Sequence, residues 1–574
     1  MTVATPWEPE RGAQVVGVAD TPEPPSQRSG RRAPWWLWAA GVVVVFPLVL
    51  PLVSLFVRVL GATEAARDIL FDPRTAELAI RSTVLTVLVT ATAVVVGVAA
   101  AWLTTSTDLP GRKAWAVIVP LPLVIPSYVL ALSFLAASGP GGIAASITGW
   151  RVPVLDGLPG AWLALALSTF PFVYLMVAAA LLRLDPAIED AARGLGASRW
   201  RVFWTVTVPQ LRPAIGAGAL LAALYTLSDF GAVSLMRYPA FTSAIYAQYA
   251  GRLDRTPAAV LSVLLILIAL VIIWAEGRTR GRAAYHSNRP ARPRTPQPLA
   301  RGETAGALAF LGSLVTIGVL VPVAVLVIWA WRGASVGESV TIDWGAVGGS
   351  LLGASLAAVL AMAAAIPVVV LLVRYRGRAS TWLERTVFVT FSLPHIAVAL
   401  AVVFFAVRFL GPLYQSLTLL VVVYASIFLA QATGSSKASL LQVDPSIEEA
   451  SRSLGKGSLQ TLRSITVPMI RPGLLAGGAL VFLTTMKELP ATLLLRPTEF
   501  DTLAVRIWSA ADELFYARAA ASALVLLALS AVPLYFLVLR TQRRGGTPSR
   551  GPNGPPRSGK SGKQEMHSWD EQPK

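Results

Sequence analysis

Two stretches of the chain match each other without a gap. Asp185 to Pro213 reads DPAIEDAARGLGASRWRVFWTVTVPQLRP, and Asp444 to Pro472 reads DPSIEEASRSLGKGSLQTLRSITVPMIRP, always 259 residues later. The identical pairs are Asp185/Asp444, Pro186/Pro445, Ile188/Ile447, Glu189/Glu448, Ala191/Ala450, Arg193/Arg452, Leu195/Leu454, Gly196/Gly455, Thr207/Thr466, Val208/Val467, Pro209/Pro468, Arg212/Arg471 and Pro213/Pro472. A basic connector that merely ends a helix has no reason to be copied so closely. The repeat therefore indicates two homologous halves.

Each copy of the repeat predicts a short, stiff helix that lies on the surface. Asp185 is a good N-cap acceptor, and Pro186 at the first helical position loses no N–H that the helix needs. Gly196 suits a left-handed stop at the end of the helix. The second copy repeats the scheme between Asp444 and Gly455.

A second helical stretch should follow in each copy. We expect it to end near Pro209 in the first copy and near Pro468 in the second, where the next long apolar segment begins. Two stiff surface helices related by pseudo-symmetry suit docking to a symmetric partner.

The composition around the repeat is that of a membrane protein. The 574 residues are 55% hydrophobic and 14% charged, whereas about 25% is usual for soluble domains. The net charge of +18 is spread in short basic runs between apolar segments, which argues against a nucleic-acid surface. With no cysteine and three histidines, the sequence offers no disulfide framework and no metal cage.

Apolar segments long enough to cross a bilayer predict an all-α integral membrane protein with about twelve transmembrane helices, six in each half. Prolines at Pro47, Pro51, Pro120, Pro122 and Pro126 predict kinks or re-entrant turns. The expected segments are 35–60, 76–104, 114–137, 158–183, 213–235, 257–276, 304–331, 350–374, 386–410, 413–433, 471–495 and 517–540.

The halves are expected to be joined and flanked by polar segments. We place a disordered cytoplasmic N-tail at 1–33, the first half at 34–276 and an Arg/Pro-rich linker at 277–303. The second half then spans 304–540, and a disordered C-tail takes up 541–574.

The distribution of basic residues predicts the orientation. With both termini in the cytoplasm, the inner segments carry 35 of the 49 Lys and Arg residues and the outer segments carry 13. Without the tails the inner loops still hold 23. This excess fits the positive-inside rule and predicts a multi-pass protein of the cell (plasma or inner) membrane.

The repeated stretch resembles the EAA motif of binding-protein-dependent ABC importer permeases. The residues that carry the resemblance are Glu189, Asp190, Ala191, Ala192, Gly196 and Pro209 in the first copy, and Glu448, Glu449, Ala450, Ser451, Gly455 and Pro468 in the second. Asp190 in place of Glu and Ser451 in place of Ala depart from the motif, which should make the two contacts unequal. The resemblance implies a MetI-like fold in which each loop docks an ATPase subunit.

That resemblance also implies partners and an absence of catalysis in this chain. Two copies of an ABC ATP-binding subunit would hydrolyse ATP, and an extracytoplasmic substrate-binding protein would deliver the substrate. The chain itself would be no enzyme and would bind no cofactor, metal or nucleic acid, while lipid surrounds it.

A narrower resemblance concerns the substrate. Ser228–Val233 (SDFGAV) with Phe241–Tyr246 (FTSAIY), and Lys487–Thr492 (KELPAT) with Leu495–Pro497 (LRP), are similar to fused ferric-iron permeases. Asp229 and Glu488 are repeat mates at the 259-residue offset. Ionisable groups at membrane depth mark pathways or gates.

The alternative for these acids is structural neutralisation by Lys487, Arg237 or Arg496. We therefore take Asp229, Lys487 and Glu488 as candidates for a pathway or gate. His395, which follows Pro394, is expected to be a packed residue rather than an iron ligand.

Two other interpretations remain beside this one, and a third pattern is set aside. Asp108–Lys113 (DLPGRK) resembles part of a loop signature of major facilitator carriers, which are ion-driven transporters with six plus six helices. ABC permeases for thiamine, polyamine or phosphonate are similarly built. Gly554–Ser561 has the letters of a Walker A loop, but the prolines within it and the 13 residues after it leave no nucleotide-binding domain.

Overall fold

The computed structural model describes residues 33–139, 141–149, 153–251, 253–279, 296–337 and 341–545, and in this part of the chain the regular structure is helical. The predicted N-tail up to residue 32, the linker between 280 and 295, and the Walker-like string at 554–561 lie outside the described residues.

Eight continuous helices are long and apolar enough to cross a membrane. They are α1 (Trp35–Gly61), α3 (Pro73–Ser106), α7 (Gly157–Leu181), α9 (Arg199–Val202) with η2 (Phe203–Thr207) and α10 (Val208–Ser228), α13 (Thr256–Thr279), α14 (Arg301–Val315) with η3 (Thr316–Leu320) and α15 (Val321–Ser335), α16 (Trp344–Arg374), and α22 (Ser458–Thr461) with η5 (Leu462–Thr466) and α23 (Val467–Met486).

Three further candidates are bent pairs, so up to eleven segments could span a membrane. The pairs are α4 (Arg112–Ile118) with η1 (Leu121–Val124) and α5 (Ser127–Ala137), bent by 86°; α17 (Arg378–Ser392) with α18 (His395–Phe409), bent by 106°; and α19 (Leu417–Ile427) with α20 (Leu429–Leu440), bent by 49°. The predicted segment 517–540 falls on α26 (Tyr516–Gly545), whose described apolar stretch, Tyr516–Ala531, is shorter.

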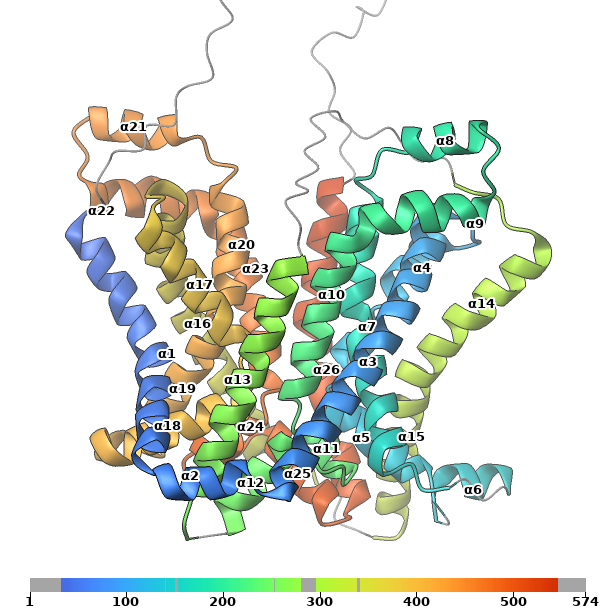
Figure 1. Cartoon of the computed structure of the whole chain (residues 1–574), viewed down its shortest axis with the longest axis horizontal. Coiled ribbons are helices and arrows are strands. Elements are labelled where there is room, and N and C mark those ends of the chain that lie inside the picture. Colours follow the sequence, from blue (N-terminus) through green and yellow to red (C-terminus); the bar gives the residue numbers. More distant parts are fainter. Residues whose placement is uncertain are drawn as a thin grey trace, which may run out of the picture.

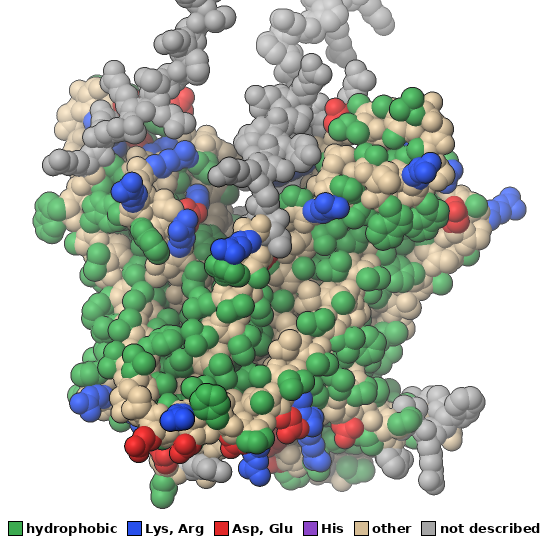
Figure 2. All heavy atoms as spheres, in the orientation of Figure 1, with side chains coloured by type: hydrophobic (Ala, Val, Ile, Leu, Met, Phe, Trp, Pro, Cys, Tyr) green, Lys and Arg blue, Asp and Glu red, His purple; other side chains and the backbone are tan. Residues whose placement is uncertain are grey.

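The remaining elements are short and lie at the two ends of the bundle (Figure 1). They are α2 (Thr63–Leu70), α6 (Ile143–Thr148), α8 (Ala187–Gly194), α11 (Gly231–Leu235), α12 (Phe241–Gly251), η4 (Gly411–Leu413), α21 (Pro445–Ser453), α24 (Pro490–Leu495) and α25 (Leu503–Asp512). Figure 2 shows a hydrophobic band between two ends where charged side chains gather. This distribution fits a multi-pass membrane protein.

The prolines predicted to kink or turn the chain lie in two different settings. The bend between α4 and α5 contains Pro120, Pro122 and Pro126, as expected for a re-entrant turn. Pro47 and Pro51 lie inside α1, which continues through them as one helix, so no re-entrant turn forms there.

Small residues let the spans of each half approach closely. A Cβ added at Gly97 in α3 would lie 2.7 Å from the Cβ of Val173 in α7, and one at Gly218 in α10 would lie 2.6 Å from its Cα. In the second half, a Cβ at Gly477 in α23 would lie 2.7 Å from the Cα of Ala432 in α20. Such small residues are what bring helices together in lipid, where apolar surface alone gives no driving force.

The first helix of each half packs on the other half. α1 lies against α16, α18 and α19, and α15 lies against α5. Arg58 of α1 stacks 4.3 Å from the ring centre of Phe404, and Trp329 of α15 donates its indole N–H to the carbonyl of Ala136 over 3.0 Å. The halves are therefore interlocked as well as repeated.

Candidate functional site

The two repeated stretches form matching surface helices at the same end of the molecule (Figure 1). The carboxylate of Asp185 accepts from the amide of Ala187 over 3.0 Å, and that of Asp444 accepts from the amide of Ser446 over 2.9 Å. The Ser446 N–H holds the pKa of Asp444 below its usual range. The predicted capping role is confirmed for Asp444, with Pro445 as the first helical residue. In the first copy it is not, because α8 begins at Ala187 with Pro186 at the cap position, so Asp185 lies one residue before the cap although it still binds the Ala187 amide.

Both surface helices end at a left-handed glycine. Gly196 has φ +84° and Gly455 has φ +85°. The amide of Gly196 donates to the carbonyl of Arg193 over 2.9 Å, and that of Gly455 to Arg452 over 3.0 Å. This confirms the predicted stop, because an L side chain is strained at such a φ whereas glycine is not.

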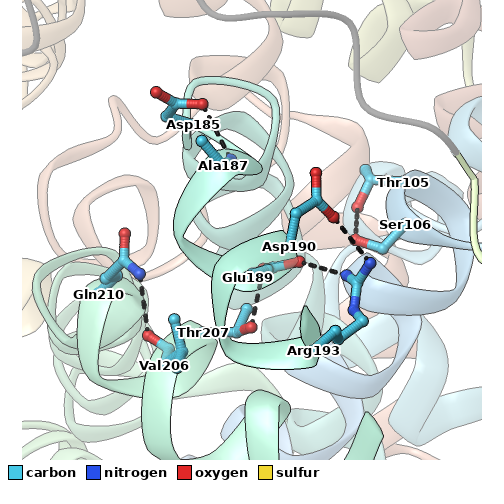
Figure 3. A network of polar contacts seen from close by, with 10 residues as sticks. All are labelled: Thr105, Ser106, Asp185, Ala187, Glu189, Asp190, Arg193, Val206, Thr207 and Gln210. Carbon is cyan, nitrogen blue, oxygen red and sulfur yellow. Dashed lines mark hydrogen bonds and ion pairs between the residues drawn. The ribbon is translucent and has the colours of Figure 1, made fainter. Parts of the chain in front are cut away.

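Glu189 lies beneath the first surface helix rather than on its outer face (Figure 3). Its side chain accepts from the hydroxyl of Thr207 over 2.8 Å and from the guanidinium of Arg193 over 3.1 Å, and the residue is 3% exposed. Thr207 belongs to η2, so the carboxylate ties the surface helix to the start of the following span. An outer partner has little access to it.

Glu448 holds the second surface helix in the same way, and it also binds an arginine from another helix. It accepts from the Thr466 hydroxyl over 2.9 Å and from Arg374 over 3.1 Å, and it is 4% exposed. Arg374, at the end of α16, also donates to the carbonyl of Val443 over 3.0 Å. Sequence reasoning did not find Arg374, since it lies outside the repeat, whereas the threonines were visible as the identical pair Thr207/Thr466.

The outward side of the helix pairs carries exposed residues of mixed character, which we call the outer faces. In the first copy Leu195 is 90% exposed. The exposed residues of the outer faces are Ile188, Asp190, Ala191, Leu195 and Trp200 in the first copy, and Ile447, Glu449, Ala450, Leu454 and Leu459 in the second.

Ser451 does not belong to an outer face. It is 3% exposed, and its hydroxyl lies 3.2 Å from that of Thr461 on α22. The corresponding residues of the first copy are Ala192 and Val202, so a polar pair replaces an apolar one inside the loop. The departure from the motif at Ser451 is therefore accommodated by a polar contact inside the loop, and it does not face a partner.

The second helical stretch does not end at Pro209 or Pro468, contrary to the prediction. It continues into the span through a five-residue π-helical turn, η2 in the first half and η5 in the second. Each proline is the second residue after this turn, as is Pro322 after η3. A π turn shifts the backbone pairing by one residue, so it accommodates the missing N–H and the ring without ending the helix.

Asp229 lies at the break between α10 and α11. Its carboxylate accepts from the amide of Ala232 over 2.8 Å and from the hydroxyl of Ser127. Ser127 follows Pro126 and is the first residue of α5, so the acid joins the end of one span to the bend of another. Tyr225 lies near enough to interact with both Asp229 and Glu488.

Glu488 repeats this arrangement in the second half. It accepts from the amide of Ala491 over 3.1 Å, and its other oxygen lies 2.9 Å from Nδ1 of His395. His395 follows Pro394 and is the first residue of α18, and it packs edge-on against Phe428 with ring centres 5.4 Å apart. It is therefore packed as expected, and it also contacts the acid. The signal was available in the two Pro-polar dipeptides, Pro126-Ser127 and Pro394-His395.

Two of the basic residues considered as neutralising partners, Lys487 and Arg496, have other contacts. Lys487 donates to the carbonyl of Leu123 in η1 over 3.2 Å, across the boundary between the halves. Arg496 pairs with Asp501. Neither of these two residues therefore pairs with Asp229 or Glu488 in the described contacts. Within the described residues, no group of three or more His, Cys, Asp or Glu could hold a metal ion.

Comparison with known proteins identifies the family. The model of the binding-protein-dependent transport system inner membrane component matches residues 93–278 and again residues 357–544. This chain belongs to that family. It is an ABC transporter permease in which two permease halves are fused.

Relatives of this permease carry several substrate names. The Fe(3+)-transport system permease protein FbpB 2 of Haemophilus influenzae is 34% identical over 513 residues, which are 88% of this chain and 98% of the relative. The molybdate/tungstate transport system permease protein WtpB of Thermococcus kodakarensis is 28% identical over 42% of this chain and 96% of its own length. A probable ABC transporter permease of Sinorhizobium fredii is 26% identical over 79% of this chain and 85% of the relative.

The major facilitator alternative finds no support, because both halves match the permease family. The acid of the motif that suggested it, Asp108, accepts from the backbone amide of Leu299, 191 residues away, over 2.9 Å.

Proposed function

We propose that this permease forms the translocation pathway of a ferric-iron importer driven by two copies of a separate ATP-binding subunit. The outer faces dock the two ATPase subunits on the cytoplasmic side, where both termini also lie. An extracytoplasmic binding protein delivers the iron at the opposite end. The observation that carries the proposal is the doubled, internally anchored helix pair at one end of the molecule.

The anchoring of the helix pairs supports their role as levers. Glu189 and Glu448 bind the threonines at the base of the next span, and in each half the helix continues from the loop into that span without a break. A displacement of the outer face is therefore transmitted along a continuous helix toward Asp229 or Glu488. We propose that the ATPases move the levers together and that the halves tilt between outward and inward access.

We propose that the exposed residues of the two loops contact the ATPase subunits, whereas the two buried glutamates do not. Asp190, Ala191, Glu449 and Ala450 are exposed, while Ala192, Gly196, Pro209, Ser451, Gly455 and Pro468 shape or pack the loop. Glu189 and Glu448 position it.

The charged side chains at the points where the spans are interrupted support a cationic substrate. Two carboxylates, Asp229 and Glu488, lie where the spans are interrupted, whereas the ammonium of Lys487 binds the carbonyl of Leu123. Carboxylates attract Fe³⁺ and repel oxyanions such as molybdate. The ferric relative also matches both halves. A permease for thiamine, a polyamine or a phosphonate is an alternative outcome of the substrate test.

Docking is tested by cross-linking from single cysteines, because the natural sequence has none. Asp190→Cys and Glu449→Cys should each cross-link to an ATPase subunit in membranes of the native organism, identified by mass spectrometry. The matched control is Leu253→Cys, which is fully exposed in the connection between α12 and α13. Helix α12 lies at the end of the molecule opposite α8 and α21 (Figure 1). ATPase capture from Leu253→Cys, or from none of the three, would overturn the proposed docking.

The substrate is tested by uptake of radioactive ferric iron into cells that depend on this permease. Asp229→Asn and Glu488→Gln keep an oxygen for the amides of Ala232 and Ala491 but remove the charge. Uptake should fall by about tenfold or more in each variant, with membrane insertion and ATPase cross-linking unchanged. Unchanged iron uptake together with lost thiamine, polyamine or phosphonate uptake would reassign the substrate.

A further inference from the structure

The last residues before the second half form a strap across the first half, which we define as residues 297–299. Gln297 pairs with Thr107 in a parallel bridge: its amide donates to the carbonyl of Ser106 over 2.9 Å, and its carbonyl accepts from the amide of Asp108 over 3.0 Å. Asp108 then accepts from the amide of Leu299 over 2.9 Å. Three hydrogen bonds thus fix the strap on the turn after α3.

The strap also reaches the first lever. The guanidinium of Arg199, the first residue of α9, donates to the carbonyl of Pro298 over 2.8 Å. Arg199 follows the turn that begins at Gly196, so the strap is bound at the joint between the two surface helices. The chain between the halves is therefore connected to the element that we propose docks an ATPase.

The second lever is braced in another way. Arg374, at the end of α16, binds both Glu448 and the carbonyl of Val443. The bends of the two halves, Pro126-Ser127 and Pro394-His395, lie 268 residues apart, and at that spacing Arg374 corresponds to Ser106. A serine side chain is too short to make these bonds, and its backbone carbonyl instead receives the strap.

We propose that the strap replaces this arginine, so that the linker end is a positioning element for the first ATPase-docking lever. Asp108 and Arg199 are its positioning residues: Asp108 holds the strap on the turn, and Arg199 transfers that restraint to α9. The two levers of the fused chain are then held in different ways. Backbone and side-chain hydrogen bonds with the linker end hold the first lever, and an arginine holds the second. This inference rests on the proposed docking function.

The test compares Asp108→Ala, Arg199→Ala and Arg374→Ala in the full chain. Hydrogen exchange of the purified permease should accelerate roughly two- to fivefold in α8 and α9 for the first two variants, and in α21 and α22 for Arg374→Ala. Arg199→Lys should restore part of the protection. In assembled transporters, the substrate transported per ATP should fall by a similar factor.

An engineered disulfide tests whether the strap itself is responsible, because closing it should restore a variant that has lost the strap but not one that has simply lost its fold. Paired residues in a bridge have Cα atoms about 5 Å apart, within disulfide range, so Thr107→Cys with Gln297→Cys should close on oxidation. In the Asp108→Ala background, the closed disulfide should restore both exchange protection and coupling, and reductant should remove them again.

The outcomes separate this inference from the docking proposal. Unchanged exchange in α8 and α9 in both strap variants, or a disulfide that restores nothing, would overturn the strap while wild-type cross-linking to the ATPase persists. Loss of wild-type cross-linking with strap-dependent exchange intact would instead overturn the docking function and leave the strap as a brace of the loop alone.

Discussion

Glu189 and Glu448 occupy matching places in the repeat, and each pairs with the arginine four residues later in its helix, but Glu448 also binds a second and more buried arginine. The side chain of Arg374, which binds Glu448, is 11% exposed, whereas that of Arg193, which binds Glu189, is 33% exposed and lies 2.9 Å from Asp190 as well. An ion stranded by loss of its partner is costly when it is buried and much less so when water reaches it. Removal of the two glutamates should therefore cost different amounts of folding free energy.

We expect Glu448→Ala to destabilise its surface helix by about 3 kcal/mol, because the largely buried Arg374 loses its carboxylate and keeps only the neutral carbonyl of Val443 among its described hydrogen-bond partners. Glu189→Ala should cost about 1 kcal/mol, because Arg193 keeps Asp190 and water. Hydrogen exchange of the α21 and α8 amides measures both effects. The control is the exposed Glu449→Ala, and equal losses in the two helices would contradict the argument.

The inward-facing pair Ser451 and Thr461 should behave as a unit. Thr461→Val alone leaves the Ser451 hydroxyl buried without its partner, which costs about 1–3 kcal/mol. Adding Ser451→Ala should recover most of this, since the first half has the apolar residues Ala192 and Val202 at the same positions of the repeat. A double-mutant cycle on thermal unfolding of the purified protein checks the coupling. Additive losses would mean that the two side chains act independently.

At the scale of elements, each lever depends on its turn. Gly196→Pro or Gly455→Pro imposes a φ near −65° where the chain has +84° or +85°, and it removes an amide donor. We expect either change to abolish transport-coupled ATP hydrolysis and leave membrane insertion intact, as measured in proteoliposomes with the partner subunits.

The control for the glycine variants is Gly194→Ala, at a position where an added Cβ has open space. It should retain coupled hydrolysis. Normal stimulated hydrolysis in both proline variants would contradict the lever role of the turns.

The sequence predicted these elements where local chemistry determines them. The cap at Asp444 and the stops at Gly196 and Gly455 depend on neighbours within a few residues, so they could be inferred from the letters alone. The continuation of the helix through Pro209 could not, because the π turn that accommodates the proline has no signature in residue type. The contact of Arg374 with Glu448 joins residues 74 positions apart, and the packing of α16 against α20 and α23 within the second half brings them together.

At the scale of the whole molecule, the interlocked first helices should couple the stability of the two halves. Gly318 in η3 meets the first half so closely that an added Cβ would lie 2.8 Å from Cγ of Pro122. Gly318→Leu should therefore lower the stability of the entire permease by about 1–3 kcal/mol through overpacking, visible as a lower unfolding temperature in detergent. Gly312→Leu on the same helix has open space and should be nearly neutral. Similar shifts in both variants would argue against a tight contact.

The exchange of first helices has a consequence for synthesis on the ribosome. α1 is made first and packs on α13 of its own half, yet the helices of the second half on which it packs begin roughly 280 residues later, from Gly61 to Trp344. At ordinary translation speeds this interval lasts about 15 to 60 s. During it α1 has only lipid and the nascent first half around it, which fits its mean hydropathy of 2.6 and its low buried share of 22%. Any product released before α16 emerges would leave that helix without its native neighbours.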